Sequence, residues 1–182
     1  MPKYVAFLRA INLGARRTFP KDAIRACVEG TGAVGVETHI NTGNVLLRTR
    51  LRSRSRVASV LEDAFRADRG FEVPTVVLTP SELRTVVAAG EELAREHPEA
   101  VRHYVTLLKE EPDAAVVKDV LDRLATPGVT LGVVGRAVHV LPEEVLGQGG
   151  PQNERLERLL GVATTRNQSV LRAVVQKWCP PA

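Results

Sequence analysis

The sequence lacks most of the features that mark common enzyme and membrane classes. Its 182 residues include only two cysteines, Cys27 and Cys179, which are too few and too far apart for a disulfide framework or a zinc-binding pattern. No apolar run approaches the roughly 18 residues that a membrane span requires. No Walker loop, dinucleotide fingerprint, nucleophile elbow or Ser-His-Asp set is present. We therefore expect no metal, no cofactor and no membrane partner.

Aromatic residues are also scarce, at 4% of the chain, whereas 44% of the residues are hydrophobic and 25% are charged. That balance is typical of an ordinary globular protein. The sequence from Met1 to Val5 leads straight into a strand pattern, without the charged and apolar regions of a signal peptide. We therefore expect a cytoplasmic protein, long enough for one full-size domain or for two small ones.

Positive charge is concentrated in the first third of the chain. Residues 1–56 contain eleven Lys and Arg against three acidic residues, a net charge of +8, and the remaining residues carry −4. A basic segment of this kind could attract phosphate or nucleic acid. It could equally pack against the acidic second half or remain solvated, so the charge alone does not choose a partner.

Hydrophobic periodicity predicts a β-α-β-β-α-β order over residues 1–80. Short apolar runs indicate strands at 5–9, 36–40, 45–48 and 75–78, and apolar residues at helical spacing indicate helices at 20–28 and 57–65. Gly43 supplies the positive φ that a tight turn between the second and third strands needs. A helical connection follows over residues 81–101.

The same rhythm returns over residues 102–160 as a β-α-β-β-α unit. Strands are predicted at 103–108, 129–134 and 137–141, with helices at 116–124 and 151–160. Residues 161–182 are predicted as a C-terminal helix, from Gln168 to Gln176, and a tail. The predicted fold class is therefore α+β, with duplicated ferredoxin-like βαββα units, mostly antiparallel sheets and a C-terminal helical extension.

Two polar segments interrupt the apolar runs of the first unit and form the candidate site. They are Arg9-Ala10-Ile11-Asn12-Leu13-Gly14 and Asn41-Thr42-Gly43-Asn44. Strands of a βαββαβ unit alternate in direction along the chain, so both segments should lie at one edge of the sheet, where the first helix also begins. Asparagines donate and accept hydrogen bonds, glycines allow close backbone approach, and a helix N-terminus favours an anion. Arg16 and Arg17 add positive charge. The alternative is that the asparagines only satisfy turn backbone.

Arginine recurs at every second position in the segment after the third strand. In an extended chain these side chains would share one face and could follow a phosphate backbone. The aromatic residues that nucleic-acid-binding sheets use for stacking are missing from this strand, which favours a solvated charged connection. The five residues are Arg48, Arg50, Arg52, Arg54 and Arg56.

Two histidines, His103 and His139, fall on strands that are predicted to be neighbours. No third ligand at a credible spacing accompanies them. We therefore interpret both as satisfied or exposed side chains rather than as a metal site.

Three segments carry a family resemblance: Tyr4–Gly14 (YVAFLRAINLG), Thr38–Leu47 (THINTGNVLL) and Thr165–Asn167. Together they resemble the pattern of domain-of-unknown-function family 1697, an uncharacterised bacterial family. The resemblance covers nearly the whole chain, implies a duplicated α+β architecture, and brings no established activity. The matching residues are Arg9, Ile11, Asn12, Gly14, Gly43, Asn44, Arg166 and Asn167.

The sequence departs from that family pattern at four positions. Ala10 replaces a glycine, Asn41 a glutamine and Thr42 a serine, and Gln168 replaces an aromatic residue that usually follows the late Arg-Asn pair. The missing aromatic argues against a stacking role at that point. Asn167 could also simply cap the final helix.

The leading hypothesis is a binding protein for a small polar or anionic ligand. The ligand would lie at the edge formed by Asn12, Asn41 and Asn44, with positive charge from Arg9 or Arg166. The hypothesis rests on convergent polar turns in a chain that shows no set of nucleophile and base.

Two other function classes stay open. One is nucleic-acid binding through the basic first third of the chain. The other is an enzyme of unknown reaction, for which Asp22, Glu37 and His39 are the ionisable groups nearest the edge. The sequence identifies neither the ligand nor the oligomeric state.

Overall fold

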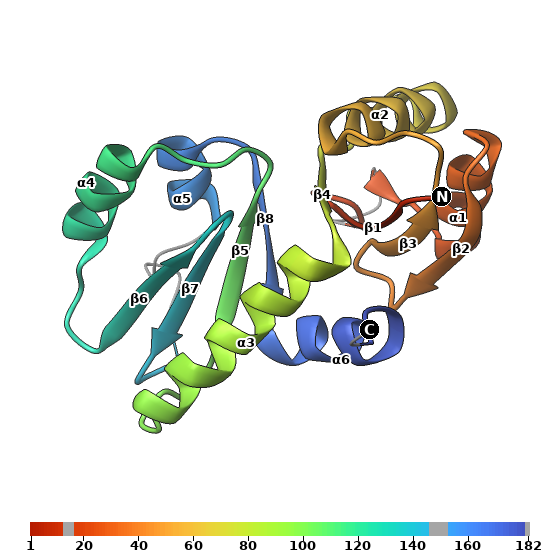
Figure 1. Ribbon diagram of the computed structural model, residues 1–182. Coiled ribbons are helices and arrows are strands. Elements are labelled where there is room, and N and C mark those ends of the chain that lie inside the picture. The colour runs from red at the N-terminus through yellow and green to blue at the C-terminus, as the bar shows by residue number, and fades with distance from the viewer. Residues whose placement is uncertain (13–16, 146–152, 181–182) are drawn as a thin grey trace. The chain divides into compact units, whose positions relative to one another are not determined.

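The chain forms two compact units, Met1–Pro80 and Ser81–Ala182, in the computed structural model shown in Figure 1. The structure describes residues 1–12, 17–145 and 153–180. Each unit contains a four-stranded antiparallel sheet. The predicted α+β fold class, with helices packed on two mostly antiparallel sheets, is therefore confirmed.

The described part of the first unit contains β1 (Lys3–Leu8), α1 (Lys21–Gly30), β2 (Val34–His39), β3 (Asn44–Arg48), α2 (Arg54–Arg69) and β4 (Thr75–Leu78). Its sheet has the order β2-β3-β1-β4, so β1 is antiparallel to both of its neighbours. The ends of α2 follow local sequence signals. The Ser53 side chain accepts a hydrogen bond from the Arg56 amide at its start, and Gly70, with φ of 73°, ends it in the left-handed conformation.

One face of this sheet carries the hydrophobic core of the first unit. Tyr4 and Leu8, which point to the same side of β1, are buried in one cluster with Ile24 of α1 and Phe65 of α2. Both helices therefore pack on that face. Phe19 packs edge to face on Phe65, with ring centroids 5.2 Å apart, and this contact fastens the chain between β1 and α1 to the core.

The described part of the second unit contains α3 (Pro80–Glu96), β5 (Tyr104–Leu108), α4 (Ala114–Leu124), β6 (Val129–Val134), β7 (Ala137–Pro142), α5 (Asn153–Leu160), β8 (Ala163–Asn167) and α6 (Gln168–Trp178). Its sheet has the order β6-β7-β5-β8, the same arrangement as in the first unit. The helix α3 precedes this β-α-β-β-α-β order, and α6 follows it.

The strand β8 is an element that the hydrophobic pattern of the sequence does not predict. It pairs with β5 over its whole length, and Arg166 lies opposite Val105. The segment is only five residues long and four of these are polar, so it carries little of the hydrophobic periodicity that reveals a strand. With β8 the second unit is a complete β-α-β-β-α-β unit, and the final helix begins directly at its end.

The two faces of the second sheet contact different helices. On one face, Leu108 and Val138 share a core cluster with Val120 of α4 and Leu156 of α5. On the other face, a Cβ added at Gly132 would lie 2.8 Å from the Leu93 side chain, so α3 packs directly on the backbone of β6.

The contact between α3 and α6 depends on a glycine. The Gln168 side chain donates a hydrogen bond from Nε2 to the Val87 carbonyl at 2.9 Å, and a Cβ at Gly90 would lie 2.5 Å from the same nitrogen. No helix in the described ranges is both long and apolar enough to cross a membrane.

Candidate functional site

The two polar segments singled out in the sequence lie together at one edge of the first sheet. The Leu8 amide donates to the Gly43 carbonyl at 2.8 Å, which joins the end of β1 to the turn between β2 and β3. The Arg9 amide donates to the Pro74 carbonyl at 2.9 Å, which adds a third segment, the connection from α2 to β4. We call this region the loop edge: residues 9–12 and 17–20, 40–43 and 70–74. The sequence pattern indicated the first two segments and not the third.

Asn12 cross-links the loop edge through its side chain. Its Nδ2 donates to the Asn41 carbonyl at 2.8 Å and to the Phe19 carbonyl at 3.2 Å, and its Oδ1 accepts from the Phe19 amide at 2.8 Å. The carboxamide therefore bonds to backbone groups of two different loops. This is the positioning role that asparagine plays in turns, and it fixes the loops relative to each other.

Asn44 fastens the same turn from inside. It is fully buried, and its Nδ2 donates to the His39 carbonyl at 3.0 Å and to the Thr42 hydroxyl at 2.9 Å. Gly43 precedes it with φ of 75°, and a Cβ there would lie 2.7 Å from the Leu8 Cβ and 2.8 Å from the Ile11 side chain. Only glycine fits this position.

Backbone strain is concentrated at the loop edge. Within the described ranges, the non-glycine residues with positive φ are Ala10 and Asn12, both at 55°, and Ile40 at 49°. All of them belong to the loop edge. A positive φ is uncommon in residues other than glycine, and it is rarest in β-branched residues such as Ile40. Each such conformation costs about 1–3 kcal/mol of folding free energy, which the surrounding contacts must offset.

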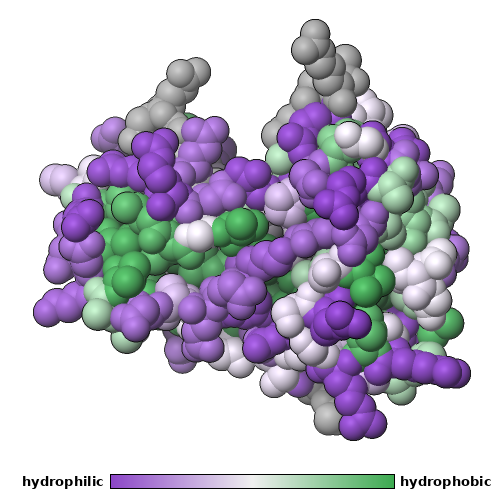
Figure 2. Space-filling view, turned by 90° about the horizontal axis from the view of Figure 1, so that it is seen from above, coloured by the Kyte–Doolittle hydropathy of each residue, from purple (hydrophilic) through white to green (hydrophobic). Residues whose placement is uncertain are grey.

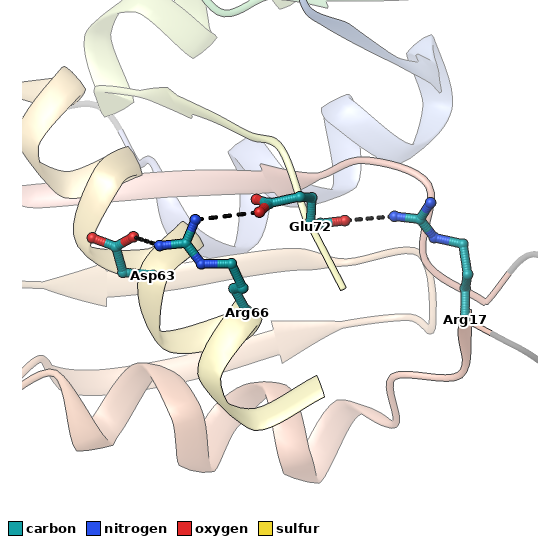
Figure 3. A network of polar contacts seen from close by, with 4 residues as sticks. All are labelled: Arg17, Asp63, Arg66 and Glu72. Atoms are coloured by element: carbon teal, nitrogen blue, oxygen red, sulfur yellow. Dashed lines mark hydrogen bonds and ion pairs between the residues drawn. The ribbon is translucent and has the colours of Figure 1, made fainter. Parts of the chain in front are cut away.

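Arg17 is a cation at the loop edge whose guanidinium is held in place by residues of the connection from α2 to β4. Its Nη2 donates to the backbone carbonyl of Glu72, and its guanidinium lies over the Phe71 ring, 5.0 Å from the centroid. The carboxylate of Glu72 is turned to Arg66, at 3.2 Å, and Arg66 also binds Asp63 at 2.6 Å. Figure 3 shows this division, with Arg66 between two carboxylates and Arg17 facing only a carbonyl oxygen. The positive charge of Arg17 is therefore not neutralised by Glu72.

The thiol of Cys27, on α1 of the first unit, is not activated. Burial raises the pKa of Cys27 to about 11, and a hydrogen bond to the Asp68 carboxylate acts in the same direction. The Arg69 guanidinium, which hydrogen-bonds to Asp68, lowers the pKa of that carboxyl. At neutral pH Cys27 is a thiol and not the thiolate that nucleophilic catalysis requires.

The remaining candidate residues are distributed as follows. Arg9 is half-buried and Asn41 is exposed, both at the loop edge, whereas Gly14 and Arg16 lie outside the described residues. Arg166 and Asn167 belong to the second unit, at the end of β8.

Arg166 is almost fully buried in the second unit. Its Nη1 donates to the Thr164 hydroxyl and to the Thr165 carbonyl, both at 2.8 Å. Burial lowers its pKa to about 10, still well above neutral pH. Asn167 occupies the N-cap position of α6, but its side chain makes no capping hydrogen bond.

The arginine series does not form one extended row. Arg48 ends β3, whereas α2 already begins at Arg54, so the last two members, Arg54 and Arg56, lie in the first turn of a helix. Helical and extended segments space their side chains differently, and the shared face expected for the five residues is lost.

The predicted neighbours His103 and His139 do meet. Nε2 of His103 lies 2.9 Å from Nδ1 of His139, across the pairing of β5 and β7. In the parts of the chain that the structure describes, no group of three or more His, Cys, Asp and Glu side chains is arranged to hold a metal ion.

Two units with the same strand order, the first carrying cross-linked polar loops at one sheet edge, define an α+β protein of repeated β-α-β-β-α-β architecture. The chain belongs to the family described as a protein of unknown function, DUF1697, whose model matches residues 1–138. This match confirms the resemblance carried by the strand and loop segments of the sequence.

A solved structure shares the fold over nearly the whole chain. The similar protein is the conserved bacterial protein SP0830 from Streptococcus pneumoniae, with a TM-score of 0.75 and 18% sequence identity. The alignment covers 97% of this chain and 98% of that one. At this identity the likeness concerns the fold alone. No curated protein matches the chain.

Proposed function

We propose that the chain binds a small polar or anionic ligand at the loop edge of the first unit, in the cytoplasm that the sequence predicts as its compartment. The observation that carries this proposal is the guanidinium of Arg17. It is held by a carbonyl oxygen and an aromatic ring, and among the described residues it forms no ion pair. An arginine fixed in this way presents a planar set of donors to a carboxylate or phosphate group.

The strained loops support the same site. Ala10, Asn12 and Ile40 are held in unfavourable conformations by hydrogen bonds and packing, and such strain gathers where a ligand needs a preformed binding surface. A surface whose described segments are already held by hydrogen bonds and packing loses little conformational entropy on binding.

Charge at the loop edge also favours an anion. Arg9 lies at the end of β1, and α1 begins at Lys21 without a side-chain cap on its first amides. Arg66 holds the Glu72 carboxylate away from Arg17, so this acid does not compete directly for the cation. Asp22 in the first turn of α1 is an opposing charge, and it limits the contribution of the helix N-terminus.

The test is a thermal-shift titration of the full chain with inorganic phosphate, pyrophosphate, sulfate and citrate. We expect at least one of these anions to raise the melting temperature of the wild type. Arg17→Gln should abolish that rise, because it removes the positioned guanidinium. Arg25→Gln is the matched control: it removes the same charge from the same unit, at an exposed pair with Glu29 on α1.

Equal shifts in the wild type and in Arg17→Gln would refute the proposal. Arg17→Lys separates the two contributions of arginine, since it keeps the charge and loses the planar donor set. Asn12→Ala and Asn44→Ala, which disturb the loops without changing charge, should also weaken the response.

Nucleic-acid binding is the second candidate, and one observation favours it. The five arginines from Arg48 to Arg56 are all exposed, and among the described residues Arg48, Arg50, Arg52 and Arg56 form no ion pair. A phosphate backbone would gain from such a cluster even without one extended row. This candidate predicts binding to DNA or RNA probes that weakens steeply between about 50 and 200 mM salt. Absence of binding at low salt would eliminate it.

A further inference from the structure

We propose that β6 of the second unit pairs with β6 of a second copy of this chain, so that two sheets join across a two-fold axis. In the sheet order β6-β7-β5-β8, β6 is an edge strand. No strand among the described residues pairs with its outer side. Figure 2 shows hydrophobic surface exposed over the part of the molecule where Figure 1 has α4, α5 and β6.

The backbone of β6 offers a regular set of outward hydrogen-bonding groups. The Glu143 amide donates to the Gly128 carbonyl at 2.8 Å, so even-numbered residues of this segment bond toward β7. Because bonding direction alternates along an antiparallel strand, the groups of Val129, Leu131 and Val133 point away from β7. Only the Val129 amide is used locally, by the Thr126 carbonyl at 3.1 Å.

The edge strand β2 of the first unit has protections that β6 lacks. β2 contains a register shift between Val34 and Glu37, a positive φ at Gly35, and the charge of Glu37 itself. Bulges and charges of this kind prevent edge-to-edge pairing in natural sheets. By contrast, β6 keeps one register with β7 over its whole length, and residues 126–135 contain no charged side chain.

A second copy of β6 fits this edge through its own pattern. With the two-fold axis at Leu131, each Leu131 lies opposite its equivalent, and Val129 lies opposite Val133 of the other copy. The amide and carbonyl of Leu131, the amide of Val133 and the carbonyl of Val129 then find partners, and the side chains of these residues fall on the same face of the joined sheet. These three side chains are half-buried in each copy of the chain, so the pairing covers apolar surface as well as backbone.

The charge pattern favours this occupant over an unrelated peptide. Because β6 has no charged side chains, it offers no complementary charge to an acidic or basic peptide. Two copies of β6, by contrast, can pair without bringing like charges together. A contact based on one strand of six residues is small, so we expect weak, concentration-dependent association.

Cysteine cross-linking tests the register directly. In the proposed pairing, Leu131→Cys places two thiols opposite each other at a Cα separation of about 5.5 Å, which suits a disulfide. Under mild oxidation of the full chain, we expect Leu131→Cys to give a covalent dimer. Val129→Cys and Val133→Cys should cross-link when mixed with each other, and much less when each is oxidised alone. The wild type, with Cys27 and Cys179, is the background control.

Equal cross-linking of the three variants would mean random collision and would overturn the proposal, as would no covalent dimer from Leu131→Cys. A backbone test that adds no thiol accompanies this. Val133→Pro removes one outward amide and leaves the bonds to β7 intact, whereas Val133→Thr keeps that amide. In sedimentation velocity we expect the wild type and Val133→Thr to associate as concentration rises, and Val133→Pro to remain monomeric with unchanged circular dichroism. A wild type that stays monomeric at millimolar concentration, or an equally associating Val133→Pro, contradicts the pairing.

Discussion

Nε2 of His103 and Nδ1 of His139 lie 2.9 Å apart inside the second unit, and the rings meet edge to face. His139 is fully buried, and the outer nitrogens of the pair, Nδ1 of His103 and Nε2 of His139, have no hydrogen-bond partner among the described residues. Burial lowers the pKa of each histidine to about 4, helped by Arg172 near His103 and by His103 near His139. Both side chains are therefore neutral at pH 7.

This pair predicts acid sensitivity of the fold. In the unfolded chain a histidine takes up a proton below its ordinary pKa of about 6.5, whereas in the folded protein it does so only near 4. The unfolded state thus binds more protons across that window, and stability falls as the pH drops from about 6.5 toward 4. For the buried His139 we expect a loss of about 2–3 kcal/mol, measured by urea unfolding across this range.

The variant His139→Leu should reduce that pH dependence, because leucine does not titrate and His103 is then the one histidine of the pair that still contributes. The comparison is His97→Gln, directly after α3, which removes a histidine outside the pair. A profile that is the same in all three proteins would contradict this assignment.

Gly43→Ala should destabilise the first unit by about 2 kcal/mol or more, because it adds both a strained φ and a collision with Leu8 and Ile11. Gly32→Ala separates the two effects. Gly32 also has a positive φ, of 82°, but nothing lies within 4 Å of its added Cβ, so we expect a loss of about 1 kcal/mol there. Chemical denaturation measures both variants. Equal losses would mean that the close approach at Gly43 has no cost.

Asn12→Ala removes three hydrogen bonds and leaves an alanine at φ of 55°. We expect a loss of about 1–2 kcal/mol, reduced from the sum of these contributions because Asn12 is exposed and water replaces part of its bonding. Asn41 receives its bond from Asn12 through the backbone carbonyl, so Asn41→Ala should change the free energy of unfolding by less than about 0.5 kcal/mol. The reverse order of effects would show that the cross-link does not stabilise the loops.

Gly90→Ala should disrupt the contact between α3 and α6. The new methyl group would displace the Gln168 amide and leave the buried Val87 carbonyl without that donor, at a cost of about 2 kcal/mol. Gln168→Ala makes room for the methyl group, so the double variant should lose less than the sum of the single losses. Strict additivity in this double-mutant cycle would disprove the coupling.

Much of the fold follows from local sequence signals. Apolar periodicity locates the strands of the first unit, and Gly43 marks a turn in which a residue must have a positive φ. Alternation of strand direction then places Asn12 and Asn41 at one edge, where the structure joins them by a hydrogen bond. These are consequences of short-range geometry, which a single sequence contains.

Other features depend on distant partners and gave no local signal. β8 forms because β5 offers it an edge to pair with, although four of its own five residues are polar. The role of Arg17 depends on Phe71 and Glu72, more than fifty residues away. The spacing of Arg48 to Arg56 suggested one extended row, but the Ser53 cap starts a helix within it.

The pairing of β8 with β5 also determines when the second sheet can be completed during synthesis. The first unit has all of its described strands once Leu78 has been made. β5 emerges by Leu108, but its neighbour at the sheet edge ends only at Asn167. Translation must therefore run for almost sixty further residues before that neighbour is complete. A nascent chain stalled within this interval exposes the side of β5 on which β8 pairs to other chains and to chaperones.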